Sequence, residues 1–211
     1  SRLLPVVAKV VEYRGVFGSD QIAQGRVVVA AVVAVLAGVF GGHLLDRAGD
    51  FKQSAVIEVG PGDGALLGEL AKRSATVCAL DNSEEMLSGA RHNTREVPNI
   101  EYHLGEPKTL IAHRGTFAAA VVNMVLHHVA EPAALVRDTA LLLRPGGELI
   151  ISDLCPHDQA WAREHCGDLW LGFSPEDLRA WAVTTGLEHC AELFFAQRNG
   201  FQIQVQHFKR C

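Results

Sequence analysis

The chain has 211 residues, with 19 Lys and Arg residues against 24 Asp and Glu residues and a net charge of −5 at pH 7. Hydrophobic residues make up 48% of the chain and charged residues 20%, which fits a folded globular protein long enough to bury a core. This acidic balance supplies no basic stripe for a phosphate backbone, so we expect no nucleic-acid partner. The five cysteines form no CxxC pair, which argues against a disulfide framework and favours a reducing, cytoplasmic location.

The first 50 residues predict a helical extension before the main domain. Residues 3–13 carry apolar side chains at helical spacing, and Ser19-Asp20 can cap a second helix that runs towards Asp46. Residues 27–45 carry no formal charge, but the strongly apolar part ends at Phe40 and is short for a membrane span. We therefore expect a buried helix that covers the ligand opening or forms a homodimer contact, and no membrane association.

Residues 51–211 predict one α/β domain, because short apolar runs alternate with helical segments. Buried parallel strands need continuous apolar runs, and crossover helices cover both faces of such a sheet. The expected strands are 55–59, 76–80, 100–103, 117–122 and 148–152, and the expected helices between them are 65–73, 83–94 and 131–143.

The last part of the chain predicts one more helix and a hairpin. Ser174-Pro175 and two following acids are typical of a helix start, and Gly186 ends that helix. Segments 188–197 and 201–209 read as two strands joined across Asn199-Gly200, a strong hairpin signal. Gln202, Gln204 and Gln206 alternate with apolar residues as in a half-buried strand. The fold class expected is therefore a Rossmann-like, mainly parallel seven-stranded sheet with an antiparallel C-terminal hairpin.

The segment from Glu58 to Gly64, EVGPGDG, lies between the first predicted strand and the first helix. Glycines in this turn let a ligand approach the backbone closely, at the sheet edge where doubly wound folds bind nucleotides. Asp81 ends the second strand, where a carboxylate can accept both ribose hydroxyls. The turn fits three interpretations: a turn without ligand, a nicotinamide dinucleotide site, or a site for S-adenosylmethionine (SAM). Glu58 favours SAM, because an acid suits its cationic amino group and repels a pyrophosphate.

Four segments in this order, EVGPGDG, ALDNSEEML, MVLHHVAEP and LLLRPGGELIISD, resemble the successive motifs of class I SAM-dependent methyltransferases of the type 11/12 group. The resemblance covers about residues 54–208. The later segment SDLCPHDQAWAREHCGDLWLGFSPEDL is similar to methyltransferase domains fused to winged-helix metalloregulators. The resemblance implies methyl transfer from SAM to a small-molecule acceptor. The alternatives are a non-catalytic SAM-binding or sensing module and a nicotinamide-dependent oxidoreductase.

The same resemblance implies the residues that bind the cofactor. The methionine part would meet Glu58, Gly60, Gly62 and Gly64, and the ribose would meet Asp81. The adenine would meet Asn82, Met86, Gly105 and Glu106, and Asn123 would border the methyl-transfer channel. Pro107 departs from the family pattern, because it removes a backbone N–H where a donor to adenine is often present.

Histidines follow the fourth and fifth strands, at the edge where the acceptor should lie. A base helps methyl transfer when the accepting atom carries a proton. We therefore take His127, His128 and His157 as candidates for a base or an acceptor contact, with His128 and His157 preferred. The alternative is that these histidines only cap loops or line a lid.

The segment 154–173 is expected to form part of a lid, with residues 1–50, that shapes the acceptor pocket. Zinc bound by Cys155, His157, His165 and Cys166 is a weaker alternative, because their spacing matches no standard zinc pattern, and we expect no metal site. Trp161, Trp170 and Phe173 are expected to pack within the lid rather than form an aromatic cage.

Overall fold

A computed structural model of the chain describes residues 51–196 and 200–211. The expected helical extension 1–50, with its uncharged stretch 27–45, and Asn199 of the expected hairpin turn lie outside the described residues. The described part contains a seven-stranded sheet in the order β3-β2-β1-β4-β5-β7-β6. Its strands are β1 (Ala55–Val59), β2 (Thr76–Asp81), β3 (Ile100–Leu104), β4 (Phe117–Asn123), β5 (Leu143–Leu154), β6 (Leu187–Ala196) and β7 (Gln202–Arg210).

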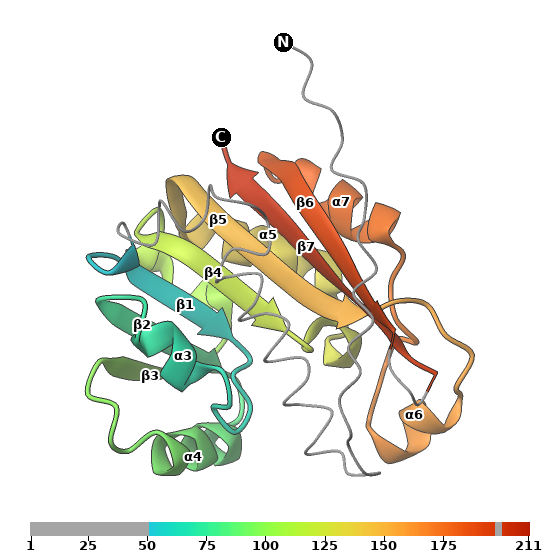
Figure 1. Ribbon diagram of the computed structural model, residues 1–211, viewed down its shortest axis with the longest axis horizontal. Helices are drawn as coiled ribbons and strands as arrows, with labels where there is room; N and C mark the ends of the chain where they lie inside the picture. Colours follow the sequence, from blue (N-terminus) through green and yellow to red (C-terminus); the bar gives the residue numbers. More distant parts are fainter. Residues whose placement is uncertain (1–50, 197–199) are drawn as a thin grey trace.

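The expected sheet is confirmed. Strands β1 to β5 pair in parallel, whereas β7 pairs antiparallel with both β5 and β6. The strand order changes direction between β1 and β4, and doubly wound sheets bind ligands at such a switch point. Figure 1 shows the arrowheads of β1 and β4 ending at the same edge of the sheet.

Five α-helices and three short 3-10 helices are described between the strands. The expected cap of the helix after β2 is confirmed, because Ser83 Oγ accepts a hydrogen bond from Met86 N at 3.3 Å. Ser174 likewise caps the helix before β6, in a reciprocal capping box with Asp177. The helices are α3 (Leu67–Ala71), α4 (Glu84–Asn93), η1 (Pro107–Thr109), η2 (Ile111–His113), η3 (Leu126–His128), α5 (Pro132–Leu142), α6 (Trp161–His165) and α7 (Pro175–Val183).

The fifth strand is longer than the sequence predicts. It begins at Leu143 rather than at residue 148, because Leu143 already pairs with Phe117 before a shift in register. The segment Arg144–Gly147, expected as a sharp turn, is therefore included in β5. The first helix is shorter than expected and begins at Leu67, after the glycine turn.

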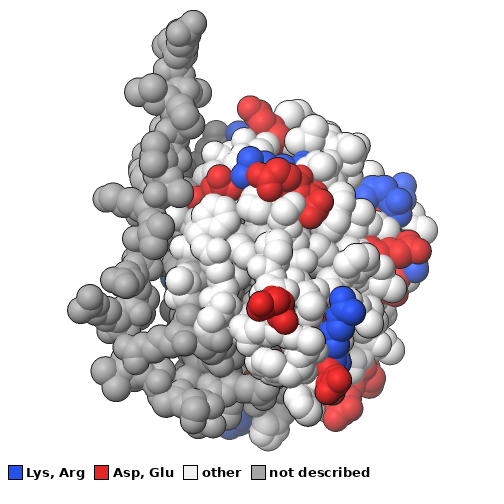
Figure 2. Space-filling model, turned by 90° about the vertical axis from the view of Figure 1, so that its right-hand side faces the viewer, with Lys and Arg blue, Asp and Glu red and all other residues white. Residues whose placement is uncertain are grey.

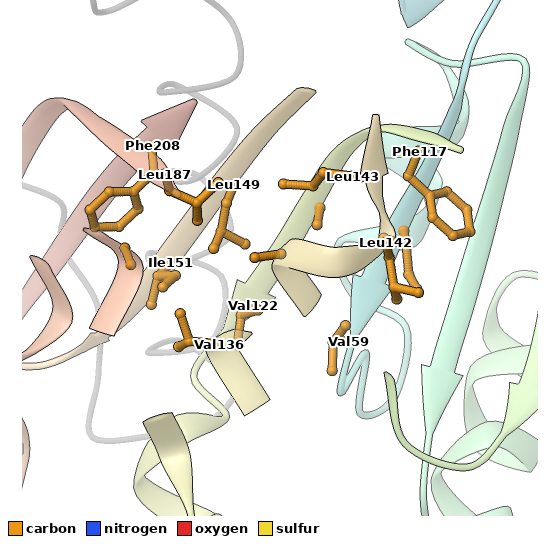
Figure 3. Packing of buried hydrophobic residues seen from close by; sticks show 14 of the residues in the cluster. Val59, Phe117, Val122, Val136, Leu142, Leu143, Leu149, Ile151, Leu187 and Phe208 are labelled. Atoms are coloured by element: carbon orange, nitrogen blue, oxygen red, sulfur yellow. The ribbon is translucent and has the colours of Figure 1, made fainter. Parts of the chain in front are cut away.

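Hydrophobic side chains cover both faces of the sheet. Alternate residues of β1 separate, since Val56 joins the cluster under α3 and α4 while Ile57 and Val59 join the cluster under α5 and α7. This alternation is the period of two that a strand buried on both faces requires. Figure 3 shows part of the cluster under α5 and α7, to which β4, β5, β6 and β7 contribute side chains together with Val136 of α5.

The glutamines of β7 correct one expectation. Gln204 and Gln206 are completely buried, so this part of the strand is covered on both faces rather than half-buried. Their amide groups stay hydrogen-bonded, as buried polar groups must: Gln204 Nε2 donates to Phe173 O at 2.6 Å and Gln206 Nε2 donates to Glu192 Oε2 at 3.1 Å. The polar row therefore ties β7 to β6 and to the segment before α7.

Two further observations concern the sequence-based expectations. All five cysteines are free thiols, and no helix within 51–196 or 200–211 combines the length and apolar character needed to cross a membrane. The face in Figure 2 carries acidic and basic side chains in small interspersed groups, so its described part presents no continuous basic stripe.

Candidate functional site

A cavity of about 420 Å³ opens at the carboxyl ends of the central strands. Most of its lining residues lie at or just after the carboxyl ends of β1, β2, β3 and β4, around the switch point of the sheet. Seven of the residues expected at the cofactor line it: Gly60, Gly62, Asp81, Asn82, Met86, Gly105 and Glu106. Its other lining residues are Val59, Leu80, Pro107, Met124, Val125, His128, Val129 and Leu135.

The turn after β1 brings bare backbone to the cavity. Gly60 has φ 70°, and a Cβ there would lie only 2.5 Å from Cγ2 of Val125. Gly62 has φ 55°, and a Cβ there would meet no atom within 4 Å. Positive φ at both positions favours glycine. The turn therefore keeps side chains out of a space that a ligand can fill.

Gly64 and Asn123 do not line the cavity. A Cβ at Gly64 would lie 3.2 Å from Cα of Ala90, so this glycine lets α4 approach the turn. Asn123 Oδ1 accepts a hydrogen bond from Ser152 Oγ, which joins the ends of β4 and β5. Both residues therefore support the elements around the cavity without lining it.

Glu58 does not line the cavity either, but its carboxyl group is buried next to the glycine turn. It is 1% exposed, and its Oε2 has no hydrogen-bond partner in the described structure. Burial, with a smaller contribution from Asp63, raises the pKa of Glu58 from 4.5 to about 8. A buried acid without a partner is costly unless it meets a donor or a cation. Glu58 therefore fits a cationic group entering at the glycine turn.

Asp81 is fixed at the end of β2. Its Oδ1 accepts a hydrogen bond from Ser83 N at 2.9 Å, and its carbonyl oxygen accepts one from Gly105 N at 2.8 Å. These contacts hold the ends of β2 and β3 together while the carboxylate lines the cavity. A carboxylate held in this way can accept hydrogen bonds from the hydroxyls of a sugar.

Apolar and strained residues form the opposite wall. Met124 has φ 57°, and among the residues that the structure describes it is the one non-glycine residue with positive φ. Such strain persists where the surrounding structure enforces it, and it concentrates at functional sites. Pro107 is buried at the start of η1 and lines the cavity, so an adenine at this position would meet a wall without a backbone N–H.

Only one of the three candidate histidines lines the cavity. His128 does so, with 45% of its side chain exposed. His127 is 4% exposed and instead contacts Asp153, with His127 Nδ1 2.8 Å from Asp153 Oδ1. His157 packs edge-on against Phe201 with ring centroids 4.7 Å apart. The preferred pair, His128 and His157, therefore does not share the cavity wall.

The histidines also differ in their protonation. Burial and then the neighbouring His127 lower the pKa of His128, which favours a neutral imidazole. Burial alone would lower the pKa of His127, but the hydrogen bond to Asp153 and the charges of Asp153 and Asp168 raise it above its usual value. Burial lowers the pKa of His157.

Two acids that the sequence analysis missed organise these histidines. Asp153 is completely buried and accepts hydrogen bonds from Leu126 N at 2.9 Å and Leu154 N at 2.8 Å. Asp168 is 6% exposed, and its Oδ1 lies 4.0 Å from His127 Nε2 and 3.7 Å from His128 Nδ1. Asp153 follows a predicted strand as Asp81 does, and that signal could have found it. No sequence signal marked Asp168.

The aromatic residues of segment 154–173 pack against different neighbours, and no residue of this segment lines the cavity. Trp170 Nε1 donates to Val129 O at 2.9 Å, Trp161 packs against Phe201, and Phe173 is buried in the core. Of the proposed cysteine and histidine ligands, Cys155 is buried and Cys166 is exposed. The one group of possible metal ligands among the described residues is instead His127, His128 and Asp168.

The family model described as "Methyltransferase domain" matches residues 57–151. The matched span begins in β1, ends in β5 and contains both the glycine turn and Asp81. The matched span is a methyltransferase domain, and the sheet has the class I methyltransferase fold. The strands β6 and β7 follow the matched span and complete the sheet of this methyltransferase domain.

Curated proteins similar to this methyltransferase domain include two enzymes of ubiquinone biosynthesis. The ubiquinone biosynthesis O-methyltransferase of Sodalis glossinidius (strain morsitans) is 34% identical over 69% of this chain and 64% of its own length. An uncharacterized 37.1 kDa protein in transposon TN4556 of Streptomyces fradiae is 37% identical over 47% of this chain and 30% of its own length. The ubiquinone biosynthesis O-methyltransferase of Xanthomonas oryzae pv. oryzae (strain PXO99A) is 36% identical over 66% of this chain and 64% of its own length. The chain thus spans less than two thirds of the length of these curated relatives.

Solved structures share the fold of the methyltransferase domain. The magnesium protoporphyrin IX methyltransferase of Synechocystis PCC 6803, solved with bound SAH, has a TM-score of 0.71 at 20% identity and covers 93% of this chain and 90% of its own. The [4+2]-cyclase SpnF has a TM-score of 0.72 at 15% identity, and the match covers 98% of this chain and 87% of the cyclase. Since one of these proteins is named a methyltransferase and the other a cyclase, the shared fold alone does not determine the reaction.

Proposed function

We propose that the chain transfers a methyl group from SAM to a hydroxyl oxygen of a small molecule. The observation that carries this proposal is the pairing of a glycine turn open to the cavity with a buried, unpartnered acid beside it. SAM has a cationic amino group, a ribose and an adenine but no pyrophosphate. A pyrophosphate would place negative charge near Glu58, so a nicotinamide dinucleotide fits this turn less well.

The lining residues fit the parts of SAM in chain order. Glu58 would bind the amino group, with Gly60 and Gly62 giving the methionine part close access to the backbone. Asp81 would accept hydrogen bonds from the ribose hydroxyls. The adenine would lie between Met86 and the segment Gly105–Pro107.

When bound, SAM supplies an electrophilic methyl group on a positively charged sulfur and leaves as S-adenosylhomocysteine. The protein's task is to align the acceptor with this group and to keep water out, since positioning supplies much of the rate of a displacement. Met124, Val125 and Leu135 give the cavity an apolar wall that excludes water. A hydroxyl acceptor also has to lose its proton as the new bond forms.

His128 is the residue best placed to receive that proton. Its Nδ1 lies 3.4 Å from Gly167 O, a contact in which a carbonyl can only accept, so Nδ1 carries the hydrogen and Nε2 is free to accept. The lowered pKa of His128 keeps the ring neutral near pH 7. The hydroxyl acceptor itself is supported by the names of the ubiquinone biosynthesis O-methyltransferases, which are similar to this chain.

Two measurements test the proposal. SAM and S-adenosylhomocysteine should raise the melting temperature of the purified protein, whereas NAD⁺ should not. Mass spectrometry of a metabolite extract incubated with the protein and isotopically methyl-labelled SAM should then show a labelled methyl ether. A shift with NAD⁺ alone would favour an oxidoreductase. SAM binding without a labelled product from any hydroxylated compound would favour a binding or sensing module.

A further inference from the structure

The segment after α6 is attached to η3 beside the cavity. Leu169 N and Trp170 N both donate to the carbonyl oxygen of His127, at 2.8 and 3.1 Å, and Trp170 Nε1 donates to Val129 O. These bonds place Asp168 against His127 and His128 although about 40 residues of sequence separate them. Three potential metal-ligating side chains therefore meet at the edge of the proposed acceptor space.

Their ligand atoms lie close together. One nitrogen of each histidine and one carboxylate oxygen of Asp168 are all within 4.8 Å of one another. Zinc bonds of about 2.0–2.2 Å set the ligand atoms of a tetrahedral site about 3.3 Å apart. The distances of 4.0 Å and 3.7 Å from Asp168 Oδ1 to the two histidines exceed this separation by less than 1 Å. Small side-chain rotations would close the difference.

A second observation indicates that this group is built for a ligand. The Asp168 side chain is only 4% exposed, and its Oδ1 has no hydrogen-bond partner in the described structure. A separation of 4.0 Å from His127 Nε2 is too long for a hydrogen bond. A buried carboxylate oxygen without a partner is costly, and a bound cation would remove that cost.

Asp153 prepares His127 as a ligand. Its carboxylate already accepts two backbone N–H groups, and His127 Nδ1 lies 2.8 Å from Oδ1, so Nδ1 of His127 donates to it. The neutral tautomer then has its lone pair on Nε2, on the side of Asp168. Metal-ligating histidines commonly donate their second ring N–H to a carboxylate in this way, which fixes the tautomer and the ring orientation.

We propose that His127 Nε2, His128 Nδ1 and Asp168 Oδ1 bind one divalent transition-metal ion of the Zn²⁺ class at the edge of the cavity. Two imidazoles and one carboxylate suit such an ion, and three protein ligands leave a coordination position open. Mg²⁺ prefers oxygen ligands and is disfavoured by this set.

On the proposed methyl-transfer function, the open position binds the hydroxyl of the acceptor. The cation lowers the pKa of a bound hydroxyl, so the proton leaves to water and the oxygen keeps the electron pair that forms the bond to the methyl carbon. In the cation-loaded protein, His128 is then a ligand rather than a base, and its ring hydrogen lies on Nε2 because Nδ1 gives its lone pair to the cation instead of a hydrogen to Gly167 O.

Metal binding can be measured without SAM or an acceptor, so its result is independent of the methyl-transfer proposal. Protein stripped with a chelator is titrated with Co²⁺, whose visible absorption reports coordination, and the bound Co²⁺ is then displaced with Zn²⁺. We expect one equivalent per chain, no thiolate charge-transfer band, and no competition from Mg²⁺. Asp168→Asn and His128→Gln should each weaken binding at least 100-fold, and Asp153→Asn should weaken it about 10- to 100-fold.

Matched variants separate this site from other binding. Asp158→Asn makes the same change at an exposed acid of the same segment, and Cys166→Ser removes a nearby exposed thiol, so both should bind Co²⁺ as the parent does. Because Asp168 is buried, circular dichroism checks its variant, and the half-exposed His128 provides a second variant that should remain folded. The proposal is overturned if no tight equivalent binds, if both ligand variants bind normally, or if Cys166→Ser abolishes binding.

Discussion

Replacing Glu58 by Gln tests whether this buried carboxyl is kept for a cationic ligand. Burial raises the pKa of Glu58 from 4.5 to about 8. Between these values the folded protein holds a proton that the unfolded chain releases. The free energy of unfolding of the ligand-free protein therefore falls as the pH rises from 4.5 to about 8, and it remains reduced above that pH. Gln has the shape of the protonated acid and does not ionise, so the variant should escape this loss.

The size of the effect follows from the same values. A pKa raised from 4.5 to about 8 corresponds to at most about 5 kcal/mol. Water that enters the adjacent cavity would solvate the carboxylate, so we expect a gain of roughly 2 kcal/mol at pH 9. For a protein of this length that is a melting temperature about 4–8 °C above the parent. The difference should be smallest near pH 4.5, where the folded protein holds the proton and so do half of the unfolded chains.

Thermal melts between pH 4.5 and 9, with and without SAM, measure both consequences. The Gln variant should be the more stable protein without ligand but should bind SAM about 10- to 100-fold more weakly, because it loses a charge-assisted hydrogen bond. Glu101→Gln is the control, since Glu101 lies on β3 with 64% of its side chain exposed. Equal pH profiles for parent and Glu58→Gln, or unchanged SAM binding, would refute the assignment of this acid.

Three other substitutions test the site and the fold. Gly60→Ala should destabilise the protein by about 2–4 kcal/mol, because its Cβ would lie 2.5 Å from Val125 Cγ2. Denaturant unfolding measures this destabilisation, which should be smaller when Val125 is also replaced by Ala. Equal destabilisation in the parent and in the Val125→Ala variant would contradict the contact. Asp81→Asn should keep the hydrogen bond from Ser83 N. Its affinity for S-adenosylhomocysteine, measured by calorimetry, should be about 10-fold or more lower than that of the parent. An unchanged affinity would show that Asp81 does not bind the ribose. Gly172→Ala should lower the melting temperature most, because its Cβ would lie 2.1 Å from the Cys155 carbonyl oxygen, and a variant as stable as the parent would show that this loop adapts.

Most of the cavity lining that follows β1, β2 and β3 was predictable from the sequence. Glycines with positive φ, an acid at the end of β2 and the residues after β3 are features of strand ends and tight turns, and parallel strands bring such ends to one edge. Gly64 and Asn123, also expected at the cofactor, do not line the cavity. The structure uses Gly64 for the approach of α4 and Asn123 for a bond to Ser152. A glycine or asparagine at such a position can either contact a ligand or support a neighbouring element, and only the packing of the folded chain distinguishes the two roles.

The surroundings of the histidines were harder to predict. His127 and His128 are adjacent in sequence, yet one is buried against Asp153 and the other faces the cavity. Gln204 and Gln206 likewise have the alternation of a half-buried strand, although both of their faces are covered. Alternation reports that two faces differ but not whether the polar face meets water or a buried hydrogen-bonding partner.

The sequence by itself determined the order of the strands along the chain, the glycine turn and the acid that ends β2, because these depend on local periodicity and backbone freedom. Only the tertiary structure decided that Asp168 meets His127 and His128. That meeting depends on backbone hydrogen bonds from Leu169 and Trp170 to the carbonyl of His127. Backbone groups are alike in every residue except proline, so a contact made through them leaves no pattern in the order of the side chains.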